Sequence, residues 1–260
     1  MALHFIVDEL PALLDEHGEI LPNAVVVLAG AEARHAVTVR RVRAGEAVTV
    51  GDGRGTLADG VCERAEAAEV IVRVTAVRRV EAGSPRLVLV QALAKGDRDE
   101  LAIQAATELG VDAVLPWAAS RSVSRWDGPK VAKGLARWAT IVREASKQAH
   151  RARVPEVGPL VTTGDLVALA ATSRMLLLEP TAAARLSELR LAGAGAGAST
   201  VADERDLVLV VGPEGGFSPE ELERLAAAGA TPARMGETVL RTSTAGPAAL
   251  AVVSVLLGRW

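Results

Sequence analysis

Apolar residues follow two different patterns along this chain, and the change comes near residue 85. The first part holds short runs rich in β-branched residues, typical of strands: VVVLAG (25–30), EAVTV (46–50) and AEVIVRVTAV (68–77). GDGRG (51–55) predicts a tight turn between strands, because glycine tolerates positive φ angles. Short strands joined by such turns predict a small β-barrel over residues 1–80.

From residue 86 onward the chain alternates apolar strands with helical segments. RLVLVQALA (86–94) and DLVLVVG (206–212) are continuous apolar runs, as in the buried strands of a parallel sheet. Further strands are expected in VDAVLPW (111–117), RMLLLEP (174–180) and Thr238 to Leu240. This alternation predicts an α/β fold for residues 86–260, and EAGSP (81–85), with its Gly, Ser and Pro, is the expected boundary.

The helical pattern is clearest in SPEELERLAAAG (218–229). Ser218 and Glu221 have the spacing of a capping box, Pro219 suits the first helical position, and Gly229 suits the end. A second helix is expected to begin at a capping Asp97 and to end at Gly110, burying a face made of Leu101, Ala105 and Leu109.

Three more segments complete the expected organisation of this part. A long helix should run from about residue 129 to 151, and AGAGAGAST (192–200) should form a flexible surface loop. The last helix, from about Thr244 to Gly258, is apolar on nearly all sides. It should therefore be buried or used in an interface.

The composition is that of a folded globular protein and limits the chemistry. Of the 260 residues, 50% are hydrophobic and 23% are charged. The single cysteine, Cys62, excludes an internal disulfide, and the four histidines lack metal-ligand spacing. Asp8 and Glu9 interrupt the first apolar stretch, and the apolar run from Ala245 to Gly258 is too short to span a bilayer. We therefore expect a cytoplasmic protein with no membrane segment and no metal.

Positive charge is concentrated locally, although the net charge is −3. RHAVTVRRVR (34–43) holds four arginines within ten residues, a density that suits contacts to phosphates. A solvated strand face is the alternative. Aromatic residues make up only 2% of the chain, so a nucleic-acid partner should be bound mainly through its backbone and a shaped pocket rather than by stacking.

The first candidate for chemistry is VVGPEGGFSPEEL (210–222), where a buried strand ends in glycines before a capped helix. Ligands of open α/β sheets bind beyond the carboxyl ends of the strands, and glycines let a ligand approach the backbone. The loop lacks the lysine and the glycine spacing of phosphate-binding loops. A cationic ligand without phosphate therefore fits better than a dinucleotide, and a simple glycine turn is the alternative.

Two further strand ends carry unusual polar residues. In MGETVLRTSTAGPAAL (235–250), Arg241 lies between an apolar strand and an apolar helix, and the three hydroxyl residues that follow it are candidate caps for that helix. In LLLEP (176–180), Glu179 and Pro180 end an apolar strand, an arrangement that an ordinary turn also explains.

These segments together resemble the SPOUT superfamily of methyltransferases, and more closely the RsmE-type small-subunit (16S) ribosomal RNA uridine methyltransferases. The resemblance covers nearly the whole chain. Its most specific parts are GPEGGFSPEEL (212–222) and MGETVLRTSTA (235–245), in this order and spacing. Weaker support comes from RHAVTVRRVRAGEAVTVGDGRG (34–55), KGDRDELAIQAATELGVDAVLP (95–116), RSV (121–123) and RWATIVREASKQAHRARVPEV (137–157).

The resemblance implies a PUA-like, RNA-binding β-barrel over residues 1–80 and a SPOUT methyltransferase domain over 86–260, an α/β domain with a C-terminal trefoil knot. It implies a homodimer that uses the knot region and the last helix. It also implies that three loops hold S-adenosyl-L-methionine (AdoMet). The corresponding residues are Leu178, Glu179, Pro180, Gly212, Pro213, Glu214, Gly215, Gly216, Phe217, Met235, Gly236, Val239, Leu240, Arg241, Thr244 and Ala245.

The implied reaction methylates ring nitrogen 3 of a uridine in 16S rRNA of the small ribosomal subunit. That nitrogen is a poor nucleophile while it carries a proton, so the proton must leave or the uridinate must be stabilised. Arg241 is the first candidate to stabilise the charge, with a structural link across the dimer as its alternative. Glu214 is the second candidate catalytic residue, and it is equally suited to orienting its loop.

The candidate RNA contacts, and two departures from the family pattern, complete the interpretation. Ser243 stands where relatives often carry Glu, which puts a carboxylate base there in doubt, and His4 stands where Arg is common, which weakens an RNA contact. A methyltransferase of a ribose 2′-hydroxyl or of tRNA, or a non-catalytic RNA-binding assembly factor, are the alternatives. The candidate RNA-binding residues are Arg34, Arg40, Arg41, Arg43, Arg54 and Arg121.

Overall fold

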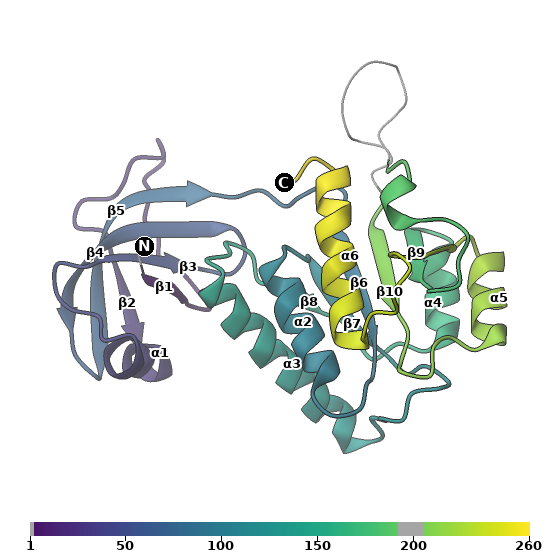
Figure 1. The fold of residues 1–260 in the computed structure, drawn as a ribbon. Helices are drawn as coiled ribbons and strands as arrows, with labels where there is room; N and C mark the ends of the chain where they lie inside the picture. Colours follow the sequence, from purple (N-terminus) through teal and green to yellow (C-terminus); the bar gives the residue numbers. More distant parts are fainter. Residues whose placement is uncertain (1–2, 192–204) are drawn as a thin grey trace, which may run out of the picture. The chain divides into compact units, whose positions relative to one another are not determined.

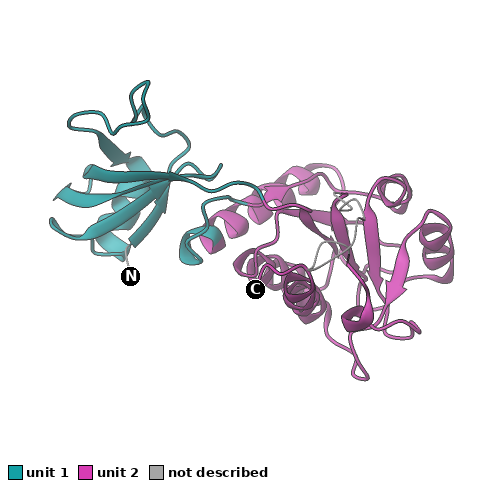
Figure 2. Cartoon of the chain, turned by 90° about the horizontal axis from the view of Figure 1, so that it is seen from above, with its two compact units in different colours: residues 1–82, 146–154 teal, residues 83–145, 155–260 magenta. Residues whose placement is uncertain are grey.

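A computed structural model of the protein describes residues 3–191 and 205–260 (Figure 1). The chain forms two compact units, Met1–Ala82 with Ser146–Val154 and Gly83–Ala145 with Pro155–Trp260 (Figure 2). The glycine-rich segment 192–200, expected to be a surface loop, lies outside the described residues. Among the described residues, no helix has both the length and the apolar character needed to cross a membrane.

The first unit is built on a five-stranded sheet with the order β1-β3-β4-β5-β2. β1 pairs with β3 in parallel, and the other neighbours are antiparallel. Phe5, Leu28 and Val50 are among the side chains of its apolar core. A short helix α1 (Gly30–Arg34) continues into a π-helical turn (His35–Val39). The strands are β1 (Leu3–Ile6), β2 (Val25–Ala29), β3 (Ala47–Gly51), β4 (Thr56–Ala65) and β5 (Glu69–Arg79).

The expected turn at 51–55 lies between β3 and β4, and a distant segment holds it. The Gly55 amide donates to the Ala152 carbonyl at 3.0 Å, and the Val154 amide donates to the Gly53 carbonyl at 2.9 Å. Gly55 has a φ of +115°, and a Cβ there would lie 2.6 Å from the Val80 carbonyl oxygen. Only glycine fits this position. The local sequence pattern gives no sign that residues 146–154 belong to this unit.

The second unit contains a six-stranded parallel sheet with the order β11-β9-β10-β6-β7-β8, which confirms the predicted α/β fold. Helices α2 and α6 contact each other, and α6 packs on β6 and β10. Helices α4 and α5 pair on the opposite face (Figure 1). The strands are β6 (Leu87–Ala92), β7 (Ala113–Trp117), β8 (Glu156–Val157), β9 (Arg174–Leu178), β10 (Leu207–Val211) and β11 (Thr231–Ala233).

Burial on both faces explains why β6 and β10 are continuously apolar. Val88 and Val210 belong to the core under α4 and α5. Leu89 and Val211 face α6, where a Cβ on Gly246 would come within 2.9 Å of Leu89. The helices are α2 (Arg98–Glu108), α3 (Pro129–Gln148), α4 (Thr163–Ala170), α5 (Pro219–Ala227) and α6 (Thr242–Leu256), with a 3₁₀ turn at Leu186–Glu188.

The capping prediction for α5 is confirmed, and the prediction for α2 is wrong in two respects. Ser218 and Glu221 form the capping box. In α2, by contrast, Asp97 occupies the N-cap position without a side-chain bond. The helix buries Ala102, Ile103 and Ala106 and leaves Leu101 49% exposed. The small residues face inward because α6 packs closely against α2.

The region before α6 also differs from the expectation. Residues 238–240 form no strand, and the strand that joins the sheet here is β11, Thr231–Ala233. β11 pairs with β9 at the edge of the sheet, a position that tolerates Pro232. The segment that follows β11 is thereby left free to cross the end of the sheet.

Candidate active site

The three candidate segments meet in one pocket of about 460 Å³. β9 and β10 are neighbours in the sheet and end side by side, at Leu178 and Val211, and the segment before α6 crosses beside them. The pocket is lined by Arg98, Leu178, Glu179, Pro180, Val211, Gly212, Pro213, Glu214, Gly216, Phe217, Met235, Gly236, Thr238, Val239, Leu240, Arg241, Thr242 and Ala245.

This set contains all the residues expected to hold a cofactor except Gly215 and Thr244. It also contains two residues outside the three expected loops, Arg98 and Val211. Arg98 belongs to the KGDRDE segment that follows β6. It reaches the pocket because β6 lies next to β10 in the sheet, which the linear sequence does not disclose.

Tight turns and one aromatic ring shape the wall formed by residues 212–217. Phe217 is 5% exposed and packs on Trp117, with ring centroids 5.5 Å apart. A Cβ on Gly212 would come within 3.2 Å of the Phe217 ring. Gly216 has a φ of +67°, and its amide donates to the Pro213 carbonyl at 2.8 Å. Gly216 is half-buried and leaves backbone accessible at the edge of the pocket, whereas Gly212 is buried against the ring.

Two charged side chains fix this loop from behind. The Arg121 guanidinium donates to the carbonyls of Gly215, at 3.0 Å, and Phe217, at 2.9 Å. Glu221 accepts from the amides of Ser120 and Ser218, both at 2.8 Å. Burial raises the pKa of Glu221, but these amide hydrogen bonds outweigh it and leave the pKa below its usual range. Arg121, expected to contact RNA, therefore serves here to hold the loop.

Glu214 is held by the start of α2. Its carboxylate accepts from the Arg98 guanidinium at 2.8 Å and from the Lys95 amide at 3.1 Å. Burial raises the pKa of Glu214, but hydrogen bonds from its own amide, Arg98 and Lys95 outweigh it and lower the pKa overall. A carboxylate stabilised in this way is a weak proton acceptor. The geometry favours the orienting role of Glu214 over that of a general base.

Arg241 is the N-cap residue of α6 and is exposed at the pocket. No ion pair of its guanidinium occurs within residues 3–191 and 205–260. The alternative reading of the hydroxyl residues as helix caps is not supported, because α6 has no side-chain cap. Instead, the Oγ1 atom of Thr242 is buried without a hydrogen-bond partner in the described part of the chain. Ser243 is half-buried and does not line the pocket.

A small ion network anchors the segment that crosses the pocket. Glu237 accepts from Arg185 at 2.8 Å and lies 3.9 Å from Arg234. Arg234 in turn donates to the carbonyls of Ala182 and Ala183. Val239, between this anchor and α6, leaves 76% of its surface exposed. These contacts therefore anchor Arg234 and Glu237, whereas Val239 is open to solvent above the pocket.

The arginines expected to bind RNA in the first unit are all exposed: Arg34, Arg40, Arg41, Arg43 and Arg54. Arg41 follows the π-helical turn with a φ of +56°, a conformation that is uncommon outside glycine. His4, by contrast, is 4% exposed. Burial, followed by the nearby charges of His150 and Arg78, lowers the pKa of His4 to about 4. His4 therefore has no surface with which to contact RNA.

The described residues contain no cluster of three or more His, Cys, Asp or Glu side chains arranged to hold a metal ion. Cys62 is buried in the first unit, and burial raises its pKa further. A thiolate nucleophile is therefore not available at Cys62.

Comparison with known proteins gives matches over both units. Residues 82–254 match the family model of an RNA methyltransferase domain, and residues 28–75 match that of an RNA methyltransferase PUA domain. A ribosomal RNA small subunit methyltransferase E from Mycobacterium bovis is 44% identical over 100% of this chain and 94% of its own length. The corresponding enzyme of Bacillus subtilis is 32% identical over 65% of both chains.

Solved structures agree with these matches. A ribosomal RNA small subunit methyltransferase E from Neisseria gonorrhoeae, bound to S-adenosyl methionine, superposes with a TM-score of 0.79 at 27% identity, covering 98% of both chains. A methyltransferase from Legionella pneumophila in complex with the same molecule gives 0.80 at 29% identity and the same coverage. The predicted fold class, an α/β methyltransferase domain with an N-terminal PUA domain, is confirmed. The trefoil knot stays a prediction.

Proposed function

Because this chain belongs to the family of small-subunit ribosomal RNA methyltransferases, we propose that it methylates ring nitrogen 3 of a uridine in 16S rRNA, with AdoMet as methyl donor. The observation that carries the proposal is the convergence of the loops after β9 and β10 with the segment before α6 on one pocket. Two relatives of the same fold were crystallised with this cofactor.

The residues of the pocket fit AdoMet. Leu178, Phe217 and Leu240 offer apolar surface for an adenine ring, and the glycine turn of 212–216 leaves main-chain groups accessible. The pocket has no lysine, which suits a ligand without phosphate. Glu179 and Glu214 supply negative charge beside a cationic ligand. When bound, AdoMet would supply an electrophilic methyl group.

Two arginines of the pocket are suited to the acceptor base. Arg98 is fixed by Glu214, whereas Arg241 is exposed and its guanidinium forms no ion pair within the described residues. A guanidinium that donates to the uracil oxygens stabilises the negative charge that develops when nitrogen 3 loses its proton. Glu214 positions Arg98, and solvent takes the proton. Thr242, whose Oγ1 is buried without a hydrogen-bond partner in the described residues, also lines this pocket.

We assign the two parts of the chain different roles in this reaction. Residues 1–80 bind RNA through the exposed arginines that follow the π-helical turn, and residues 86–260 carry the cofactor and the chemistry. The target uridine must leave its base stack to enter a pocket of this kind. A 16S rRNA segment in the small subunit, with an accessible uridine, is the expected substrate.

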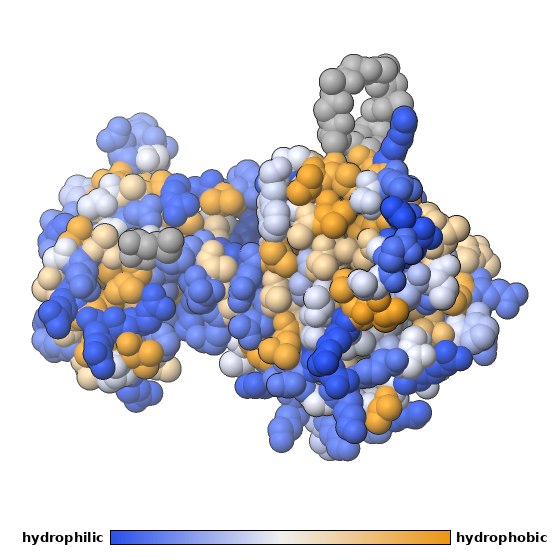
Figure 3. Space-filling view, in the orientation of Figure 1, coloured by the Kyte–Doolittle hydropathy of each residue, from blue (hydrophilic) through white to orange (hydrophobic). Residues whose placement is uncertain are grey.

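A homodimer through α6 is part of the proposal. Apolar side chains gather over α6 and the segment before it (Figure 3). Val255 of α6 is 60% exposed and Trp260, which follows the helix, is 63% exposed. An exposed apolar surface of this kind is typical of a subunit interface. Sedimentation at micromolar concentration should give twice the monomer mass.

Labelled AdoMet and small-subunit RNA test the function directly. We expect radioactive methyl transfer to RNA from a strain that lacks this enzyme, and 3-methyluridine as the labelled nucleoside after digestion. A 2′-O-methyl nucleoside, or labelling of tRNA instead, would assign the chain to another substrate. Absence of AdoMet binding in a calorimetric titration would leave only an RNA-binding assembly role.

A further inference from the structure

A second pocket, of about 260 Å³, lies between the start of α2 and the first turns of α3. We call it the α2–α3 pocket; it includes Gly96, Asp99, Trp126, Lys130, Lys133 and Arg137. It is smaller than the roughly 300–1,000 Å³ of sites that enclose a whole small molecule. That size suits one unit of a longer ligand.

The α2–α3 pocket and the candidate active site share a wall. Arg98 lines the active site, and Asp99, the next residue along α2, lines the α2–α3 pocket. Hydrogen bonds from Lys95 and Arg98 to Glu214 fix this wall. A polymer with one unit in the active site therefore has a neighbouring unit within reach of the α2–α3 pocket.

Trp126 is a fixed, half-buried ring in this pocket. It lies directly on Gly134 of α3, where a Cβ would come within 2.6 Å of the indole. It also meets the buried Trp138 edge-on, with centroids 5.6 Å apart and planes at 80°. An indole held in this way loses little freedom when a base stacks on it.

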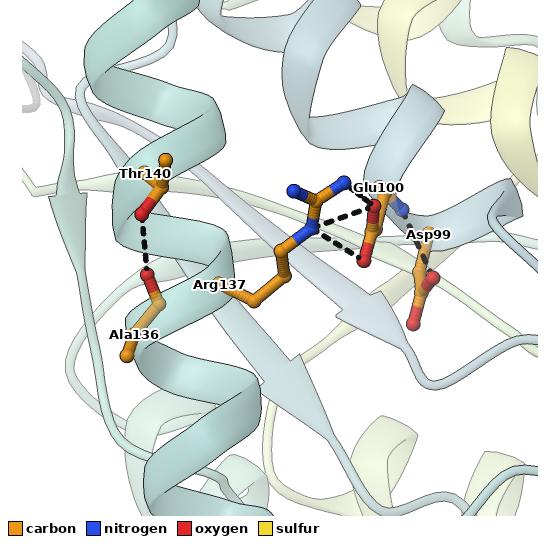
Figure 4. Close-up of polar contacts among 5 residues, drawn as sticks. All are labelled: Asp99, Glu100, Ala136, Arg137 and Thr140. Atoms are coloured by element: carbon orange, nitrogen blue, oxygen red, sulfur yellow. Dashed lines mark hydrogen bonds and ion pairs between the residues drawn. The ribbon is translucent and has the colours of Figure 1, made fainter.

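Among the charged side chains around Trp126, Lys130 and Lys133 form no ion pair within the described residues. Arg137 makes a bidentate contact to Glu100 and ties α3 to α2 (Figure 4). Asp99 is 5% exposed and accepts from the Glu100 amide at 2.9 Å, so little of its charge faces the pocket. Lys130 and Lys133 are exposed, and neither ammonium group forms an ion pair within the described residues. Two free ammonium groups beside a ring match the phosphate and base of one nucleotide.

We propose that the α2–α3 pocket is a subsite for a nucleotide of the substrate RNA that flanks the methylated uridine, with the base stacked on Trp126 and its phosphate held by Lys130 and Lys133. The subsite rests on the proposed function for its substrate. It works through binding alone, so it should act on the Michaelis constant for RNA and not on chemistry. It also supplies a local stacking contact in a chain otherwise poor in aromatic residues.

Tryptophan fluorescence tests the stacking contact. Of the four tryptophans, Trp117 and Trp138 are buried and Trp260 is 63% exposed, so a Trp260→Phe variant leaves Trp126 as the accessible reporter. A mixed-sequence single-stranded decaribonucleotide should quench its emission in a saturable way. Trp126→Leu should weaken binding of this RNA roughly 5- to 150-fold, and Trp126→Phe should keep most of the affinity.

Charge variants test the lysines independently of the ring. Lys130→Gln/Lys133→Gln should lower the salt dependence of RNA binding and raise the KM for small-subunit RNA, with kcat and the Kd for AdoMet unchanged. Arg190→Gln/Arg224→Gln removes two exposed cations of the same unit that line neither pocket, and it should bind RNA within about twofold of the parent.

The two proposals fail in different ways. RNA binding that is unaffected by both Trp126→Leu and Lys130→Gln/Lys133→Gln would overturn the subsite, even if methyl transfer proceeds. RNA binding that needs Trp126 in a protein unable to bind AdoMet would keep the subsite and overturn the proposed function. If Trp126→Leu does not fold, as judged by circular dichroism, the quenching of Trp126 emission in the Trp260→Phe variant and the lysine pair still decide the question.

Discussion

Replacing Glu221 with alanine should destabilise the second unit by about 3–5 kcal/mol, because its buried carboxylate accepts hydrogen bonds from two backbone amides. Glu221 is 3% exposed and accepts from Ser120 and Ser218 at 2.8 Å, with a weaker contact to Thr163 at 3.3 Å. A hydrogen bond to a charged group contributes roughly 1.5–3 kcal/mol. Glu221→Gln keeps one acceptor oxygen and should cost about half as much.

The loss should be measured by urea and thermal unfolding followed by tryptophan fluorescence. Every tryptophan lies in the second unit, so the signal reports that unit. The expected loss corresponds to a Tm lower by roughly 6–20 °C. The control is Glu220→Gln on the same helix, whose side chain is 79% exposed and pairs only loosely with Arg224 at 3.6 Å. It should change stability by less than about 0.5 kcal/mol.

The Glu221→Gln variant should also differ from the parent in its response to acid. The pKa of Glu221 is lower in the folded protein than in the unfolded chain, so its contribution is present above the ordinary glutamate pKa and is lost as the pH falls through the folded value. Glu221→Gln should therefore lose less stability than the parent on acidification below the ordinary glutamate pKa. Equal stability of Glu221→Ala and Glu220→Gln would show that the Glu221 hydrogen bonds contribute nothing to stability.

Three further predictions concern charge. Arg241→Gln should lower kcat for methyl transfer about 10²–10³-fold with a smaller change in AdoMet affinity, as measured by single-turnover kinetics; an unchanged kcat would remove Arg241 from the chemistry. His4 is buried with a pKa of about 4, so the first unit should lose up to about 3 kcal/mol as the pH falls from 6.5 to 4, because the unfolded chain binds the proton first. Hydrogen exchange of β1 and β3 should show this loss, and His4→Asn should abolish it. Replacing three exposed arginines with Gln should reduce the slope of log K for RNA against log salt by about 2–3, whereas Arg224→Gln should leave it unchanged. The three arginines are Arg40, Arg41 and Arg43.

Several features could be predicted from the sequence because they depend on neighbouring residues. The capping box of Ser218 and Glu221 needs only a four-residue spacing, and the continuous apolar runs of β6 and β10 report burial on both faces. The glycine turn at 212–216 and its position at the end of a strand could also be predicted from the sequence. Local hydrogen bonding and burial determine all of these.

Other features needed the long-range packing. Close contact with α6 determines which face of α2 is buried. That face carries Ala102 and Ala106, whereas the hydrophobic pattern alone predicted the face of Leu101. Residues 238–240 look like a strand, yet β11 takes the free edge beside β9. Arg98 could not be assigned to the pocket from the sequence, because its position there depends on the pairing of β6 with β10.

Short-range spacing encodes helices, strands and caps, so the kind of elements, their order and the chemistry available at each strand end could be derived without the structure. The folded structure was needed to learn which strand ends meet and which arginine donates to a loop carbonyl. It was also needed to place Trp126 on Gly134 beside Lys130 and Lys133. Those pairings join residues far apart in the chain. They are fixed by the burial of whole faces against one another, for which no local pattern provides a signal.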